Sequence, residues 1–361
     1  MTITDLFNTT IYTPDADVYA AAKRAWDSVA HPLDGLGILE EDICRIAAAQ
    51  RNVMPDISKK ALIIFCADNG VVSEGVSQCG SEVTYKVAEL MGHRKSSVGM
   101  MTSAYPIDIF TVDTGIDSDE IIDGVKDCKV RRGSGNIVKE AAMSEEECLQ
   151  AIECGIVMVK ELSQKCYGII ATGEMGIGNT TTSTAMICAL LGLEPEKVTG
   201  RGAGLTDEGL QKKIAVIRRA LAFHGFDPES PVLTKDYAFR ALCCLGGLDI
   251  AALTGAFIGG ALYHIPLVID GLISAVAAFC AECIAPGCSG YMLASHNGKE
   301  HGCAAILDRL KLRPVIDAQL ALGEGSGAVL LLPVLDMAYD LYRAGTAFEN
   351  TDIESYKRFE Q

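Results

Sequence analysis

The segment most informative about the fold is Tyr167-Gly-Ile-Ile-Ala-Thr-Gly-Glu-Met-Gly-Ile-Gly-Asn-Thr-Thr-Thr182. It begins with a short apolar run typical of a buried strand, and threonines that favour a helix start follow its glycines. Glycines let the backbone approach a ligand closely, and a helix N-terminus offers free N–H groups to an anion. The segment therefore predicts a strand, a phosphate-binding loop and a helix over residues 180–191.

Similar apolar runs occur at residues 61–66, 107–112 and 267–269, and each is followed by Asp or Gly within a few residues. Helical patterns lie between them, for example over residues 144–165, 207–223 and 247–262. Alternating short strands and helices predict an α/β fold: a Rossmann-like parallel sheet with helices on both faces. In such sheets the ligand crevice lies outside the carboxyl ends of the strands.

The N-terminal part of the chain has a different pattern. Residues 17–51 are helical in character, with a break at residues 31–35. We therefore expect a small helical domain mainly from residues 1–55, to which part of the C-terminal tail, residues 336–361, can contribute. Residues 56–335 are then the large α/β domain.

Composition narrows the class of protein. Hydrophobic residues make up 49% of the 361 residues, which is enough for a sizeable core. The 47 acidic and 31 basic residues give a net charge of -16, which argues against nucleic acid and anionic membranes as partners. The apolar stretch 244–285 is interrupted by charged residues, so a membrane span is not expected. Residues 1–15 lack a secretory leader pattern, and we expect a cytoplasmic protein.

Most of the 14 cysteines are scattered among aliphatic residues and are expected to be small buried hydrophobes. The one cluster is Cys280, Cys283 and Cys288, which could bind a metal or undergo redox chemistry. No second pair lies at ligand spacing, so buried helix cysteines are the favoured interpretation. We expect neither a metal nor an organic cofactor.

The first glycine loop resembles known phosphate-binding patterns only in part. Gly173–Thr180 fits the P-loop spacing, but Asn179 stands where the pattern requires Lys, which disfavours an NTPase. A dinucleotide fingerprint fails as well, because its third glycine is missing. A purely structural glycine turn is the alternative, although Glu174 is an unusual residue for one.

Two further glycine loops carry polar groups. Gly200-Arg-Gly-Ala-Gly-Leu205 leads into a helix capped by Thr206, and Lys213 on that helix could supply the charge that the first loop lacks. Its alternative role is a solvated helix lysine beside Lys212. In Leu322-Gly-Glu-Gly-Ser-Gly-Ala328, Glu324 could act as a base if it is partly desolvated. A helix-start glutamate stabilised by the helix dipole explains it equally well.

Taken together, these residues resemble the nicotinate-nucleotide–dimethylbenzimidazole phosphoribosyltransferase family, which activates the lower ligand of cobamides. The resemblance spans nearly the whole chain, and its specificity comes from the set of blocks in order. The blocks are Pro32–Glu40, Glu74–Ser77, Glu82–Thr84, Arg131–Ser134, Gly173–Thr181, Gly200–Gly204, Leu245–Leu253, Asp270-Gly271, Ser295-His296 and Leu322–Ala328.

The resemblance implies transfer of the phosphoribosyl group of nicotinate mononucleotide to an aromatic base, with release of nicotinate. It implies that Glu324 is the general base and that Glu174 lies near the ribose or the reacting centre. Lys213 and the glycine loops would hold the phosphate. The implied substrate-binding residues are Gly176, Ile177, Gly178, Asn179, Thr180, Gly202, Ala203, Gly204, Lys213, Asp270, Gly271, Ser295, Ser77, Lys86 and Leu322.

The chain departs from the family pattern mainly on the acceptor-base side. Asn69 stands where the family usually has His, Cys79-Gly80 replace an aromatic residue and Pro, and Tyr85-Lys86 occupy the place of a Gln. Gly298 and Gly302-Cys303 also differ from the usual residues. The accepted base is therefore open among benzimidazoles, purines and phenols.

The resemblance implies a homodimer. Because the family includes paralogues that pair as heterodimers and use phenols, a heterodimer with a paralogue is the alternative. A weakly catalytic partner subunit is the main alternative function. Glu324 favours an active enzyme, because a subunit without catalysis has no need of the base. A dinucleotide-binding oxidoreductase has less support.

Overall fold

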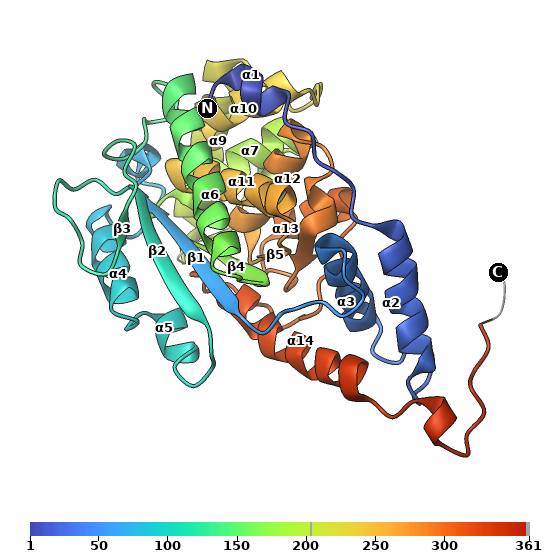
Figure 1. The fold of residues 1–361 in the computed structure, drawn as a ribbon. Coiled ribbons are helices and arrows are strands. Elements are labelled where there is room, and N and C mark those ends of the chain that lie inside the picture. Colours follow the sequence, from blue (N-terminus) through green and yellow to red (C-terminus); the bar gives the residue numbers. More distant parts are fainter. Residues whose placement is uncertain (203, 359–361) are drawn as a thin grey trace.

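The computed structural model describes residues 1–202 and 204–358, and a parallel sheet lies at its centre (Figure 1). Within those residues the strand order is β3-β2-β1-β4-β5-β6, and all neighbouring strands are parallel. This is the strand order of the Rossmann fold, whose path reverses between β1 and β4. The predicted α/β fold is confirmed. The strands are β1 (Lys60–Ala67), β2 (Asp108–Gly115), β3 (Lys126–Asp127), β4 (Ile169–Met175), β5 (Leu267–Ile269) and β6 (Met292–Ala294).

The helices connect these strands and cover the sheet. The α-helices are α1 (Ile3–Phe7), α2 (Ala16–Ser28), α3 (Ile38–Gln50), α4 (Glu82–Gly92), α5 (Ser97–Met101), α6 (Glu145–Gln164), α7 (Asn179–Leu191), α8 (Pro195–Val198), α9 (Asp207–His224), α10 (Lys235–Leu245), α11 (Leu248–Tyr263), α12 (Leu272–Ile284), α13 (His301–Leu310) and α14 (Ser326–Ala344). The short 3-10 helices are η1 (Gly70–Glu74), η2 (Cys288–Tyr291) and η3 (Phe348–Asn350).

Both faces of the sheet are covered because alternate residues of β1 point to opposite sides. Ile63 and Phe65 join a hydrophobic cluster with residues of α6, α7, α10, α11 and α12. Leu62 and Ile64 join a second cluster with residues of α3, α4 and α14. All eight residues of β1 are buried, as expected for a central strand between two helical layers.

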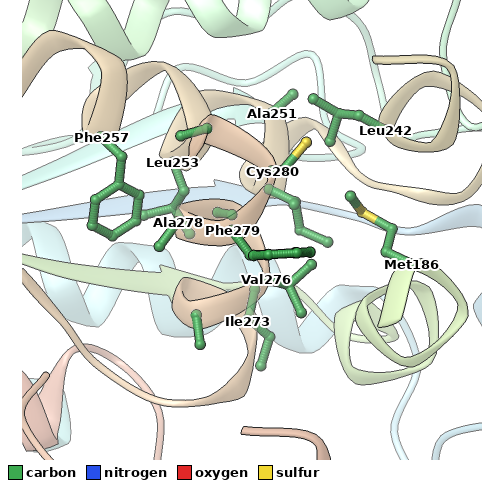
Figure 2. Packing of buried hydrophobic residues seen from close by; sticks show 14 of the residues in the cluster. Met186, Leu242, Ala251, Leu253, Phe257, Ile273, Val276, Ala278, Phe279 and Cys280 are labelled. Carbon is green, nitrogen blue, oxygen red and sulfur yellow. The ribbon is translucent and has the colours of Figure 1, made fainter. Parts of the chain in front are cut away.

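Figure 2 shows part of the first cluster, in which Cys280 of α12 lies among apolar side chains such as Leu253 and Val276. Burial raises the pKa of the Cys280 thiol well above its usual range and that of Cys283 to about 12. Cys288 is buried as well. In the part of the chain described, no three His, Cys, Asp or Glu side chains are grouped so that they could hold a metal ion.

Helices α1 and α14 lie on different parts of the fold (Figure 1). Helix α1 lies against α10, where the rings of Phe7 and Phe239 meet edge to face at 5.9 Å (Figure 1). Helices α2 and α3 lie beside α14, and the rings of Trp26 and Tyr342 are 5.0 Å apart. The division into residues 1–55 and 56–335 stays a prediction. Among the described helices, none is long and apolar enough to cross a membrane.

Helix α11 approaches α6 very closely through glycines. A Cβ atom on Gly155 would lie 1.9 Å from the Ala252 carbonyl oxygen, and one on Gly255 would lie 1.9 Å from the Ile152 oxygen. Only glycine permits backbones to come this near. This contact fixes the start of α11 at the carboxyl edge of the sheet.

Candidate active site

A cleft of about 910 Å³, including the part open to solvent, lies at the carboxyl ends of β4 and β5. This is where ligands bind in open α/β sheets. Its lining comes from the loops after these strands, the segment before α13 and the segment before α14. The lining residues are Glu174, Met175, Gly176, Ile177, Asn179, Thr180, Gly202, Asp270, Gly271, Leu272, Ile273, Ser274, His296, Gly298, Glu300, Leu320, Ala321, Leu322 and Gly323.

The first glycine loop leads from β4 into α7 at one end of the cleft. Gly178 is the N-cap of α7 with φ +97°, and no side chain caps the helix there. A Cβ atom on Gly178 would lie 2.8 Å from Val72 Cγ2, so the turn requires glycine. The Ile177 N–H donates to Thr84 Oγ1 at 3.2 Å, which ties the loop to α4.

The second glycine loop and Lys213 lie beside the first loop. Lys213 is 1% exposed, and its Nζ donates to Thr180 Oγ1 at 2.9 Å and to the Gly200 carbonyl oxygen at 3.2 Å. A Cβ atom on Gly202 would lie 3.6 Å from Nζ. Burial lowers the pKa of Lys213 to about 8. The alternative of a solvated lysine is therefore wrong, and the ammonium group lies where both loops meet.

The other predicted residues of the second loop are Ala203 and Gly204. Ala203 lies outside the described residues. The Gly204 carbonyl oxygen accepts a hydrogen bond from Gln78 Nε2, which links this loop to the segment after η1. The first loop is thus attached to Thr84 of α4 and the second to Gln78 in the segment before α4.

Glu174 and Asp270 are the most deeply buried carboxyl groups in the cleft lining. Asn179 Nδ2 donates to Glu174 Oε2 and also to Asp249 Oδ2, the latter at 3.0 Å. Burial, with the negative charge of Asp249 as the next cause, raises the pKa of Glu174 to about 8. Burial also raises the pKa of Asp249 to about 6. Near neutral pH, Glu174 is therefore largely protonated.

Asp270 anchors the third glycine loop. Its carboxylate accepts hydrogen bonds from the N–H groups of Gly325 at 3.2 Å, Gly327 at 2.7 Å and Ala328 at 3.0 Å. These are the unpaired donors at the start of α14, where a negative charge is favoured. Asp270 was expected to contact the nucleotide. It lines the cleft, and both carboxylate oxygens are engaged with α14.

Glu324 lies directly before Gly325, the N-cap of α14, so it is outside the helix. Its φ is +60°, and its two glycine neighbours also have positive φ, at +85° and +84°. Its carboxylate is half-buried and accepts a hydrogen bond from the Val98 N–H of α5 at 3.0 Å. Glu324 itself is not among the cleft-lining residues, although the adjacent Gly323 is.

The remaining predicted residues are placed differently. Gly271 and Leu322 line the cleft, and Leu322 is 52% exposed. Ser295 is buried, and its Oγ donates to the Ile269 carbonyl oxygen at 2.6 Å. Ser77 and Lys86 are outside the lining, and the Lys86 side chain is exposed. Their substrate-binding roles stay predictions.

The sequence reasoning assigned no role to three residues of this region. His296 and Glu300 line the cleft, and Asp249 lies behind Glu174. One signal was available for Asp249, because it is the only charged residue in the 16-residue apolar helix α11. A lone buried carboxylate in such a helix is expected to have a polar partner.

Comparisons with known proteins identify the family. A family model described as "Phosphoribosyltransferase" matches residues 11–353. The nicotinate-nucleotide–dimethylbenzimidazole phosphoribosyltransferases of Ruminiclostridium cellulolyticum and Acetivibrio thermocellus are each 40% identical to the chain. The alignments cover 94% of both chains in the first case and 93% of both in the second. A crystal structure of the enzyme of that name from Thermus thermophilus superposes with a TM-score of 0.84 at 34% identity, over 93% of this chain and 98% of the other.

The chain belongs to this family. The resemblance inferred from the motifs is confirmed, and the protein is a phosphoribosyltransferase. Residues of all three glycine loops line one cleft, so the loops can contact a common substrate.

We predict that Asp270→Ala lowers both stability and activity. The substitution leaves buried N–H groups of α14 without an acceptor, at about 1–3 kcal/mol for each unsatisfied group. It also frees the loop that carries Glu324, and such misplacement reduces kcat by roughly 10²-fold. Thermal melting and steady-state kinetics measure the two effects.

Asp42→Ala is the matched control, because Asp42 is a buried carboxylate of α3 outside the cleft lining. It should alter the melting temperature and leave kcat within about twofold of wild type. A normal kcat in the Asp270→Ala enzyme would contradict the anchoring role of Asp270.

Proposed function

We propose that the protein transfers the phosphoribosyl group of nicotinate mononucleotide to a lower-ligand base, 5,6-dimethylbenzimidazole or a related azole or phenol. The products are nicotinate and an α-linked nucleotide 5′-phosphate for cobamide synthesis. The observation that carries this proposal is the meeting of Lys213 with two glycine loops at one end of a cleft beside the Glu324 loop. The names of the relatives supply the substrates.

The phosphate end of the cleft suits a single phosphate group. One buried ammonium group and the uncapped start of α7 provide charge and N–H donors. A nucleoside triphosphate usually requires a metal ion and a P-loop lysine, and the corresponding position here is Asn179. A mononucleotide donor therefore matches this end of the cleft.

Glu324 is proposed as the general base. Attack by an azole nitrogen builds positive charge on the ring, and the ring N–H proton must then be accepted by a nearby group. The two flanking glycines have positive φ, and the Val98 N–H donates to the Glu324 carboxylate and holds it in place. Since the pyridinium of the donor leaves without protonation, the reaction needs no separate general acid.

Glu174 is proposed to contact the ribose near the reacting carbon. A Cβ atom on Gly323 would lie 3.0 Å from Glu174 Oε1, so this carboxyl group borders the Glu324 loop directly. Glu174 thereby lies between the phosphate end of the cleft and the proposed base. A paralogous subunit of a heterodimer that acts on phenols remains the second candidate, because the departures from the family pattern lie on the acceptor side.

The deciding experiment is product identification. Purified protein is incubated with nicotinate mononucleotide and a panel of azoles and phenols, and chromatography with mass spectrometry identifies the nucleotides formed. We expect nicotinate and an α-linked nucleotide 5′-phosphate in equal amounts with at least one acceptor. No nicotinate release with any acceptor would refute the proposal. Release only after a paralogous subunit is added would favour the heterodimer.

We predict that Lys213→Ala raises the KM for nicotinate mononucleotide tenfold or more, since charge-assisted hydrogen bonds contribute ~1.5–3 kcal/mol. In the wild-type enzyme the same KM should rise above pH 8, because the pKa of Lys213 is about 8 and its neutral form binds phosphate poorly. Lys212→Ala removes the adjacent exposed lysine and should change neither quantity. Equal KM values for the two variants would remove Lys213 from the donor site.

We predict that Glu324→Gln lowers kcat by ~10²–10⁴-fold with little change in donor binding, because the amide cannot accept the proton. Gln keeps an oxygen that can accept from the Val98 N–H, so the melting temperature should stay near that of wild type. Steady-state kinetics and a thermal melt test this, with the exposed Glu161→Gln as control. A near-normal kcat with a lowered melting temperature would make Glu324 a structural residue.

A further inference from the structure

Two buried carboxyl groups share one amide nitrogen beside the cleft. Asn179 Nδ2 donates to Glu174 of β4 and to Asp249 of α11. Glu174 lines the cleft, whereas Asp249 does not reach it. Asp249 therefore acts on the site through Asn179 and through its charge.

The second oxygen of Asp249 faces another polar side chain. A Cβ atom on Gly247 would lie 2.5 Å from Asp249 Oδ1 and 2.6 Å from Asn69 Oδ1, so both side chains border this glycine. Within residues 1–202 and 204–358, neither Asp249 Oδ1 nor the two amide atoms of Asn69 have a hydrogen-bond partner. Asp249 thus borders two amide side chains, that of Asn179, which donates to it, and that of Asn69.

Glu174 and Asp249 are not both ionised near neutral pH, because like charges repel each other strongly in the low dielectric of a protein interior. One negative charge is then shared by the pair. Asp249 lies in the first turn of α11, where the helix dipole favours a negative charge, so the charge is located on Asp249. Glu174 then keeps its proton and can donate a hydrogen bond into the cleft.

We propose that Asp249 is a positioning residue for Glu174: through Asn179 it fixes the Glu174 carboxyl group at the cleft, and its negative charge keeps that group neutral. A neutral Glu174 adds no negative charge beside an anionic donor and offers an O–H to a substrate oxygen. Its kinetic consequence rests on the proposed function, whereas the arrangement of the two acids does not.

The surrounding groups reinforce this charge balance. The titratable groups that act on Glu174 are Asp249 from α11, Asp270 after β5 and Glu300 before α13. Asp68 after β1 acts on Asp249, and both Glu174 and Asp249 act on the buried Cys66 thiol of β1. All of these are acids, and each raises the pKa of the group that it faces.

Asp249→Asn is the informative substitution, because it removes the charge and keeps the shape. The new amide can accept from Asn179 with its oxygen and donate toward Asn69 Oδ1 with its nitrogen. With the charge gone, Glu174 should lose its proton about one pH unit lower than in wild type. In a plot of kcat against pH, the decline on the alkaline side (the alkaline limb) should shift toward lower pH by the same amount.

A double-substitution cycle separates this role from a merely structural one. Glu174→Gln imitates the neutral acid and has no proton to lose, so adding Asp249→Asn to it should not move the limb further. Asp42→Asn, a buried acid of α3, is the matched control and should leave the limb in place in both backgrounds. The proposal would be overturned if Asp249→Asn shifted the alkaline limb equally in the enzyme with Glu174 and in the Glu174→Gln variant.

Thermal melting tests the same coupling without activity. A pKa raised from 4.5 to about 8 means that Glu174 stabilises the fold below pH 4.5, and this contribution is lost as the pH rises to about 8. Melting of the four variants of the cycle should therefore show a non-additive term that is small at about pH 5 and grows toward pH 9.

The outcomes distinguish the two proposals. A pH-dependent non-additive term in an enzyme that forms no product would support the coupling and remove the proposed function. Product formation with a non-additive term that does not change with pH would overturn the role of Asp249 and leave the function intact.

Discussion

The carboxylate of Asp270 holds the end of β5 to the start of α14, and the shape of the cleft depends on that contact. The loop before α14 has positive φ at Gly323, Glu324 and Gly325, so no regular hydrogen-bond ladder maintains it. The left-handed conformation of Glu324 costs roughly 1–2 kcal/mol, which the surrounding contacts must offset. Since a Cβ atom on Gly173 would lie 2.7 Å from the Glu324 carbonyl oxygen, the same loop is also pressed against β4.

The described residues that line the cleft include three acids, Glu174, Asp270 and Glu300. Among the described residues that line it, none is Lys or Arg, and the ammonium group of Lys213 approaches only from behind Thr180. Burial raises the pKa of Glu174, Asp270 and Glu300, and Glu300 is the acid that acts on Lys213. In the proposed reaction Lys213 is the group that offsets the charge of an anionic phosphate, and the protonated Glu174 adds no negative charge beside it.

The sequence predicted the long strands and the loops because these are local patterns. The runs that became β1, β2, β4 and β5 were recognisable, whereas β3 and β6 have two and three residues and too few side chains to show a pattern. Lys213, Glu174 and Glu324 were found because glycines or helix starts lie near them. The roles of Asp270 and Asp249 were not predictable, since their partners lie 55 to 58 and 70 residues away in sequence.

The departures from the family pattern differ in their surroundings. Cys79 and Lys86 are exposed, and Tyr85 is half-buried and bonded to the exposed Glu120, so substitutions there can alter an acceptor without disturbing the buried polar groups. Asn69 is the exception, because it is 1% exposed and borders Asp249 across Gly247. A side chain at position 69 therefore lies beside the buried Asp249 and not at the open surface. Asn69 at this position is thus a buried side chain that borders Asp249 and the first glycine loop.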